Sequence, residues 1–448
     1  MKTTTTILTA SCALLINSVA SAQDGGTVSR EEYNKLKRES DQMKKELAEM
    51  RAEMRQVLKQ AKTANTGDAQ PARRKASTAE NSPKLDSLID QVETLKTQVK
   101  ETIPGTTKFL LAGYGSAGLT TLQHGGSNFT ATFNPIFLWK MSDRLIFEGE
   151  MEMELSGDHT ETKLEMAQMS YVLNDYMTIG AGKFLNPANY FVERQHMAWV
   201  NKLPDKPLAV YDGLMPESNV GVQIRGVIPI GSTKLEYAAF VSNAPTLKTS
   251  PDVAGDLTTL GGLQFENNDN QDGHVAVGGH VGFLPIPELE IGYGIQSSSV
   301  GPRNSSVHAL LHSVDFSYVR DSEVFKGMLA LRGQWVWSNV GNYTYDADSS
   351  QGFGPLTFDN KRNGGYAQIS YRPTKFGNDF VKNLEPVFRY DVLNQSKTPV
   401  AYNENRYTIG LNYWLGPSTV LKLAYEIDHK TNNMQSDNAF MVQFATGF

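Results

Sequence analysis

Glutamates recur at every second position in one stretch of the chain: Glu148, Glu150, Glu152 and Glu154. The intervening positions are mostly apolar: Phe147, Met151, Met153 and Leu155. Alternate residues of a β-strand share a face and lie about 7 Å apart, so the spacing predicts a row of carboxylates on one face of a strand. This row must face water or basic partners, because an unpaired charge in an apolar environment is costly. An enzyme with paired carboxylates needs two at a defined gap, and the row singles out no such pair.

Other stretches of the chain, predicted below to be strands of the same sheet, carry basic residues on the face expected to point to the same side as the glutamate row: Arg225, Arg332, Arg389, Arg406 and Lys422. Acidic and basic arrays that face each other across water create a transverse field, which orients dipolar solutes and sets ion preference. In a second interpretation the acidic and basic arrays only neutralise each other and make the sheet that carries them rigid. The residue pattern leaves both interpretations open.

A long insert, residues 185–218, separates two predicted strands and carries charges of both signs. The basic residues are Arg194, His196, Lys202 and Lys206, and the acidic residues are Glu193, Asp205, Asp212 and Glu217. Four prolines stiffen the insert, and long loops are often functional. We expect it to form a constriction, with Lys183, Arg194, Lys202 and Lys206 on its basic side and the glutamate row opposite. The alternative is an external loop whose charges balance.

From residue 108 onward the hydrophobic pattern has period two, which predicts sixteen β-strands. Their approximate ranges are 108–119, 129–139, 144–155, 162–173, 176–184, 219–228, 233–242, 274–283, 288–297, 307–319, 326–338, 364–372, 385–393, 405–415, 419–428 and 438–448. The strands at 162–173 and 176–184 alternate poorly, which suggests a β-bulge. The last strand ends at Phe448, and its edge requires a partner, for which the first strand is the simplest choice.

The connections between these strands alternate in length. Short turns follow the second, fourth, sixth and fourteenth strands, whereas long loops follow the fifth, seventh and eleventh; residues 373–384 are an exception on the short-turn side. Short turns at one rim, long loops at the other and an even strand count are typical of bacterial outer-membrane barrels. A β-sandwich also has many short strands but gives no reason for this sorting. We therefore predict an all-β protein, a 16-stranded antiparallel transmembrane β-barrel.

The region before the barrel has a different organisation. Residues 1–22 resemble a secretory signal peptide and contain Cys12, the only cysteine. Heptad spacing predicts a coiled coil over 23–60 and a second short coiled-coil helix over 84–103, separated by a flexible linker at 61–83. Amphipathic helices that pack on their own domain are the alternative. The barrel is expected to occupy 104–448.

The C-terminal sequence YTIGLNYWLGPSTVLKLAYEIDHK…FMVQFATGF resembles the end of the phosphate-selective porin O/P family. MTIGAGKFLNPANYF, at 177–191, resembles that family's fifth strand and its entry to the third loop, although Pro187-Ala188-Asn189 departs from the usual Pro-Phe-Gly. The order of signal peptide, coiled coil, Ile103-Pro104-Gly105-Thr106 and first strand is similar to that of DcaP-type porins. The resemblance implies a sixteen-stranded trimeric porin and carries over no substrate.

These observations predict an outer-membrane porin that passes small hydrophilic, charged solutes by passive diffusion. No enzymatic activity, cofactor, metal site or nucleic-acid partner is expected. The expected partners are outer-membrane lipid, two further copies of the chain and the barrel assembly machinery, which would engage the strand ending at Phe448. The N-terminal extension is expected in the periplasm; the alternative function is an anchor that tethers the envelope to peptidoglycan through these helices. The family name suggests anions, whereas the net charge of −6 and the glutamate row favour cations or zwitterions.

Overall fold

A computed structural model describes residues 109–448, except 157–158, 212, 252–256, 258, 266–272, 304, 347–353, 396–400 and 433. The predicted signal peptide at 1–22, coiled coil at 23–60, linker at 61–83 and second helix at 84–103 lie outside the described residues. In the part that is described, no helix is long and apolar enough to cross a membrane.

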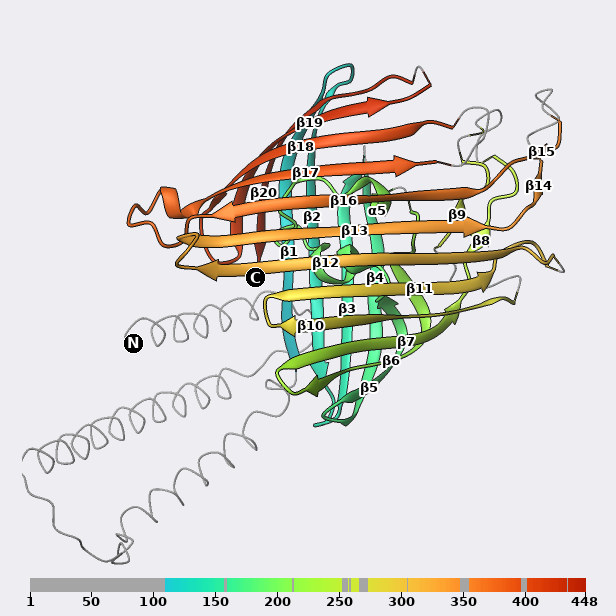
Figure 1. Ribbon diagram of the computed structural model, residues 1–448, viewed down its shortest axis with the longest axis horizontal. Coiled ribbons are helices and arrows are strands. Elements are labelled where there is room, and N and C mark those ends of the chain that lie inside the picture. Colours follow the sequence, from blue (N-terminus) through green and yellow to red (C-terminus); the bar gives the residue numbers. More distant parts are fainter. Residues whose placement is uncertain are drawn as a thin grey trace, which may run out of the picture. The chain divides into compact units, whose positions relative to one another are not determined.

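Sixteen antiparallel strands form one closed barrel (Figure 1). In barrel order they are β1 (Phe109–Leu122), β2 (Ser127–Lys140), β3 (Leu145–Ser156), β4 (His159–Asn174), β5 (Met177–Leu185), β6 (Ser218–Ile230), β7 (Thr233–Asn243), β10 (Val275–Ile286), β11 (Leu289–Ser299), β12 (His308–Ser322), β13 (Gly327–Val340), β16 (Lys361–Arg372), β17 (Leu384–Asn394), β18 (Asn403–Trp414), β19 (Thr419–Lys430) and β20 (Ala439–Gly447). The predicted strand count and order are confirmed.

The first and last strands close the barrel, as the alternating C-terminal sequence predicted. β1 pairs with β20 from Tyr114 opposite Gly447 to Leu122 opposite Ala439. Gly113 and Phe448 also exchange both backbone hydrogen bonds, at 3.1 and 2.9 Å. The described strands of the barrel therefore have no unpaired edge of the kind that invites aggregation.

The strands direct apolar side chains outward and polar side chains inward. In β11, Ile291, Tyr293 and Ile295 are exposed on the outside, and Gln296 is buried on the inside. Inward-facing glutamines such as Gln168, Gln223 and Gln334 are buried as well. This pattern is the reverse of a soluble protein's and is typical of barrels with an apolar exterior and a polar interior.

The two ends of the barrel differ in the length of their connections. At one end, Gly231 and Ser232 alone join β6 to β7, and Gly231 adopts a φ of +62°, which suits glycine in a tight hairpin. At the other end, residues 244–274 contain β8 (Thr246–Leu247) and β9 (Leu263–Gln264), and residues 341–360 contain β14 (Thr344–Tyr345) and β15 (Leu356–Thr357). The link at 373–383, which contains the 3-10 helix η3 (Val381–Asn383), is the predicted exception at the short-turn end.

The irregular alternation expected in the fourth strand corresponds to a β-bulge. Glu150 of β3 lies opposite Met166 of β4, but the next residue, Met151, lies opposite Leu164. Glu165 is therefore the extra residue of the bulge. A bulge interrupts the alternation of side chains and can redirect one of them.

Candidate functional site

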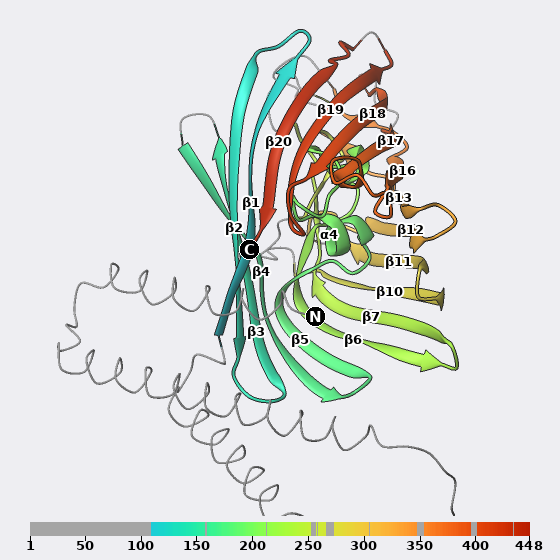
Figure 2. The ribbon, with the colours of Figure 1, turned by 90° about the vertical axis from the view of Figure 1, so that its left-hand side faces the viewer.

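The segment that joins β5 to β6, residues 186–217, contacts strands all around the barrel. It contains two short helices, α4 (Tyr190–Gln195) and α5 (Leu208–Tyr211). The backbone N–H of Phe191 donates to Gln334 of β13 at 3.0 Å, and the Gln195 amide donates to Tyr366 of β16 at 3.0 Å. In Figure 2, α4 lies between β5 on one side and β16–β18 on the other.

Apolar contacts hold the same segment against the inner side of the strands. Phe191, Val192 and Val210 pack with Tyr366 in one buried cluster. A second cluster joins the segment to β12, β13 and β17, and its buried members are Ala188, Leu208, Ala209, Leu214, Met215, Leu311, Val336 and Leu393. Most inward positions are polar, so these apolar patches on the wall specify where the segment packs.

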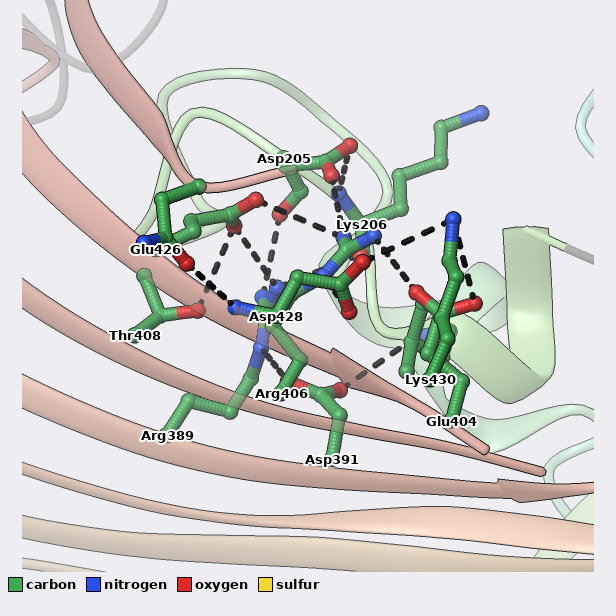
Figure 3. Close-up of polar contacts among 12 residues, drawn as sticks. Asp205, Lys206, Arg389, Asp391, Glu404, Arg406, Thr408, Glu426, Asp428 and Lys430 are labelled. Atoms are coloured by element: carbon green, nitrogen blue, oxygen red, sulfur yellow. Dashed lines mark hydrogen bonds and ion pairs between the residues drawn. The ribbon is translucent and has the colours of Figure 1, made fainter. Parts of the chain in front are cut away.

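Arg389 of β17 binds the second half of the segment (Figure 3). Its side chain is fully buried; Nε donates to Asp391 at 2.8 Å, and the two Nη atoms donate to the backbone carbonyls of Asp205 and Lys206 at 3.0 and 3.1 Å. Arg406 of β18 donates to the Asp205 carboxylate at 2.8 Å. These hydrogen bonds to ionised groups are stronger than those between neutral groups. Arg389 therefore positions the segment and does not line water, which differs from the prediction of a pore-lining cation.

Two lysines complete this attachment. Lys422 of β19 donates to the carbonyls of Ala198 and Leu203, at 2.5 and 3.3 Å. Lys202 of the segment forms an ion pair with Glu385 of β17 at 3.2 Å, and Trp414 donates to the same carboxylate at 2.6 Å. The basic residues of β17–β19 are therefore occupied by the segment and by neighbouring carboxylates.

Arg194 and Arg225 form a second charged cluster nearer the other end of the segment. Arg194 Nη2 lies 2.5 Å from Glu236 of β7, and Arg225 Nη2 of β6 lies 2.5 Å from Glu193 of α4. Both arginines remain about one-third exposed, at 36% and 34%. They link the start of the segment to β6 and β7 while keeping part of their charge in contact with water.

The other predicted cations have separate environments. Arg332 of β13 is half-buried and donates to the Gln195 side chain at 3.3 Å. Lys183 lies opposite Ala167 and Val220, next to the exposed Val222, and so belongs to the outward face of β5. The structure therefore does not bring Lys183 together with the cations of the segment. Asp212 lies outside the described residues.

The glutamate row of β3 faces inward, as predicted, because its members lie opposite inward residues of β2. Glu148 lies opposite Leu138, Glu150 opposite Ile136 and Glu154 opposite Thr132. The row divides into two kinds of environment. Glu148 accepts a hydrogen bond from Gln168 and Glu150 contacts His196, whereas Glu152 and Glu154 line a cavity.

This cavity, of about 260 Å³, lies between the segment 186–217 and the wall formed by β1–β4 and β20. Its charged lining residues are Glu152, Glu154, Glu165, His196, Asp205, Lys206 and Glu217. Lys163 of β4 lies 3.2 Å from both Glu165 and Glu217, and Lys206 lies 3.8 Å from Glu217. The cavity is therefore lined by an excess of carboxylates. The alternation of residues did not predict Glu165, because counting from Lys163 directs it inward whereas counting from Met166 directs it outward.

His196 connects the segment to the glutamate row. Its Nδ1 lies 2.5 Å from the Val192 carbonyl and its Nε2 lies 3.3 Å from Glu150, and only a doubly protonated ring donates to both acceptors. Burial lowers the pKa of His196, but the Glu150 carboxylate, the Val192 carbonyl and the more distant Glu165 outweigh burial and raise it above its ordinary value. The His196 ring also packs edge-on against Tyr114, with 6.2 Å between centroids.

A pH dependence follows from this contact. Because the pKa of His196 is raised in the folded state, its stabilising contribution is complete below the ordinary value of about 6.5 and is lost as pH rises through the raised value. We expect the free energy of unfolding to fall at the alkaline end. Guanidinium-induced unfolding between about pH 5 and 9 measures this, since that range brackets the titration of histidine. His196→Gln should abolish the titration; an unchanged profile in this variant would contradict the assignment.

Two searches by sequence gave no match: no family model matches the chain, and no curated protein matches it. Solved structures do match. OmpF of Salmonella typhi, an outer-membrane porin solved in complex with daunomycin, is 11% identical with a TM-score of 0.51, over 76% of this chain and 97% of that one. An anion-selective porin from Comamonas acidovorans is 13% identical with a TM-score of 0.48, over 76% and 99%, and OmpT, an outer membrane protein of Vibrio cholerae, is 11% identical with a TM-score of 0.47, over 76% and 97%. The similarity to OmpF shows that the described part of the chain has the fold of an outer-membrane porin barrel.

Proposed function

We propose that the protein is an outer-membrane porin through which small hydrophilic, charged solutes diffuse passively. The observation that carries the proposal is a closed barrel with an apolar exterior and a polar interior, in which a segment attached to opposite walls leaves an acidic cavity. In this proposal residues 185–218 fold inward and narrow the pore. Function then depends on the charges that remain in contact with water, and no covalent step is involved.

The proposal extends to assembly. We infer a homotrimer in the bacterial outer membrane, with a cleaved signal peptide at 1–22 and coiled coils in the periplasm. Small residues on the outward face of β1 support close packing against another barrel: Gly115 and Ala117. Phe448, exposed at the end of the last strand, is the expected contact for the barrel assembly machinery. Membership of the phosphate-selective porin O/P family, with a DcaP-type N-terminal region, is part of this proposal and rests on the short sequence resemblances.

Conductance across a planar lipid bilayer tests the proposal. We expect the purified protein to give discrete current steps, and the double variant Glu148→Gln with Glu152→Gln to shift the reversal potential in a salt gradient towards anion preference. The reason is that both carboxylates face the interior and their charge attracts cations. Glu323→Gln, on the exposed turn between β12 and β13, is a matched control that removes one carboxylate outside the barrel and should leave the reversal potential unchanged.

The alternative, an anchor that tethers the envelope to peptidoglycan, gives a different result. A tether binds peptidoglycan through residues 23–103 and gives no ionic current. A porin conducts ions whether or not those residues bind peptidoglycan. Pull-down of peptidoglycan with residues 23–103, performed beside the conductance measurement, separates the two functions. Absence of current steps from correctly folded protein would exclude the porin.

A further inference from the structure

The bulge in β4 brings an additional carboxylate into the cavity. Counted from Met166 and Gln168, which face inward, Glu165 would point outward, whereas counted from Lys163, which lies opposite Glu152, it points inward. The bulge lets both registers direct polar groups inward, and the Glu165 side chain is more than nine-tenths buried and lines the cavity near Glu152. Bulges commonly redirect a side chain at functional sites. The backbone of β4 thus departs from regular pairing at the position where the cavity gains a carboxyl group.

The cations near the cavity do not balance its carboxylates. Lys163 is shared between Glu165 and Glu217, Lys206 also interacts with Glu217, and Asp205 is paired with Arg406. Over the described residues, no ion pair joins a cation to the Glu152 or Glu154 carboxylate, and Glu165 Oε1 lies 3.2 Å from Lys163 Nζ without accepting a hydrogen bond from it. Because Lys163 is shared with Glu217, the carboxyl groups outnumber the ammonium groups, which favours one more positively charged donor.

The titration of Lys206 agrees with this excess of negative charge. Burial lowers the pKa of Lys206, but the carboxylates of Glu217, Glu152 and Glu165 outweigh burial and raise it above its ordinary value. The cavity therefore stabilises a positive charge even where water is partly excluded. A second ammonium group placed near Glu152 would experience the same field.

Part of the cavity lining is apolar. Leu185, Phe191 and Val192 form this part, and α4 holds the latter two in position. At about 260 Å³ the cavity lies just below the usual range for sites that bind drug-sized molecules, so it suits a solute of a few heavy atoms. A solute with a charged group and a short carbon chain would match both the acidic and the apolar part of the lining.

From this arrangement we propose that the cavity binds small organic cations, namely solutes with a primary ammonium or guanidinium group and a short aliphatic part. The cationic group lies between Glu152 and Glu165 and donates to Glu165 Oε1, and the aliphatic part packs on Phe191 and Val192. The inference rests on the proposed function, since it names the solute class that pauses in the pore. It assigns the bulge residue Glu165 a direct role in binding.

Current block by butylammonium tests the binding site in the full-length protein. We expect butylammonium to interrupt the potassium current with resolvable dwell times, and butyrate, a chain of matched length with the opposite charge, to cause no such interruptions. Glu152→Gln with Glu165→Gln should shorten the butylammonium dwell time at least tenfold, which corresponds to about 1.4 kcal/mol of binding free energy. Equal block by butyrate, or an unchanged dwell time in the double variant, would overturn the proposal.

Three controls make the result specific. Glu323→Gln removes a carboxylate outside the barrel and should preserve block. Phe191→Ala should shorten the dwell time of butylammonium more than that of methylammonium, because only the longer solute reaches the apolar wall. A heat-dependent change in SDS mobility verifies that each variant has formed a barrel, and Glu152→Gln alone replaces the double variant if the latter does not fold.

Saturation-transfer NMR on the detergent-solubilised protein separates this inference from the proposed function. Saturation transfer to the butylammonium methylene protons that is lost in Glu152→Gln with Glu165→Gln would support the binding site, even if no current is observed. Current without such transfer and without block supports a porin and overturns the site. Transfer that is equal in the original chain and in the double variant indicates adventitious binding only and also overturns it.

Discussion

Arg389→Met is expected to destabilise the protein by about 3–5 kcal/mol, the usual cost of removing one partner from a buried ion pair. The substitution leaves the buried Asp391 carboxylate without its cation and the carbonyls of Asp205 and Lys206 without their donors. We expect the midpoint of guanidinium-induced unfolding to fall. Because the second half of the segment 186–217 loses two of its hydrogen bonds to β17, we also expect a larger and noisier single-channel current.

The double variant Arg389→Met with Asp391→Leu serves as the control. It removes both charges, so no uncompensated ion remains, and most of the stability should return. The current should nevertheless stay noisy, since the Asp205 and Lys206 carbonyls still lack donors. A double variant as unstable as the single one would show that Arg389 acts through the segment alone; a quiet current in both would contradict its role in positioning the segment.

Glu385→Gln is expected to have an effect of similar size, about 3–5 kcal/mol, through a different partner. Glu385 accepts hydrogen bonds from Lys202, Ser370 and Trp414. Burial lowers the pKa of Lys202 and Glu385 opposes that shift, so a neutral side chain at position 385 lowers the pKa further. Without a carboxylate partner the buried Lys202 ammonium destabilises the folded state, and we expect it to lose its proton at a lower pH than in the original chain.

The pH dependence of unfolding measures the effect of Glu385→Gln. Burial already lowers the pKa of Lys202. At high pH Lys202 is therefore neutral in the variant and leaves no unpaired charge, so Glu385→Gln destabilises the protein less. The loss of stability should be largest at low pH, where Lys202 is charged. Adding Lys202→Met removes the unpaired charge and should restore most of the stability at every pH. Equal destabilisation across the pH range would contradict this account.

The strands were predictable from sequence because barrel strands obey a simple rule of alternation. Over residues 289–296 of β11 each outward residue is apolar and each inward residue is small or polar, so the pattern identifies both the strand and its faces. The terminal pairing of β1 with β20 followed from the need to cover the edge that ends at Phe448. These predictions depend only on local sequence and on the properties of strand edges.

The site was predicted only in part, because its contacts depend on features that leave no mark in the sequence. Arg389 and Lys422 bind backbone carbonyls of the segment, and a carbonyl is present at every residue. Glu165 lies at a bulge, where alternation counted from the two ends of β4 gives opposite faces. Lys183 follows Gly182, whose φ of +126° lies outside the range of ordinary strand residues, and it lies on the outward face. Each difference therefore arises where the backbone is irregular or where main-chain atoms are the partners.

The attachment of the segment to β18–β20 has a consequence for biogenesis. Ala198 binds Lys422, which is 224 positions later in the chain, and the Trp199 ring occupies the space where Gly447 lacks a Cβ atom. Contacts between such distant residues form late during folding, because the intervening chain must be ordered first. The segment can reach its final place only after the C-terminal strands have been inserted. In the porin that we propose, a nascent barrel should consequently pass through a wide, unobstructed stage before it matures to the narrower form.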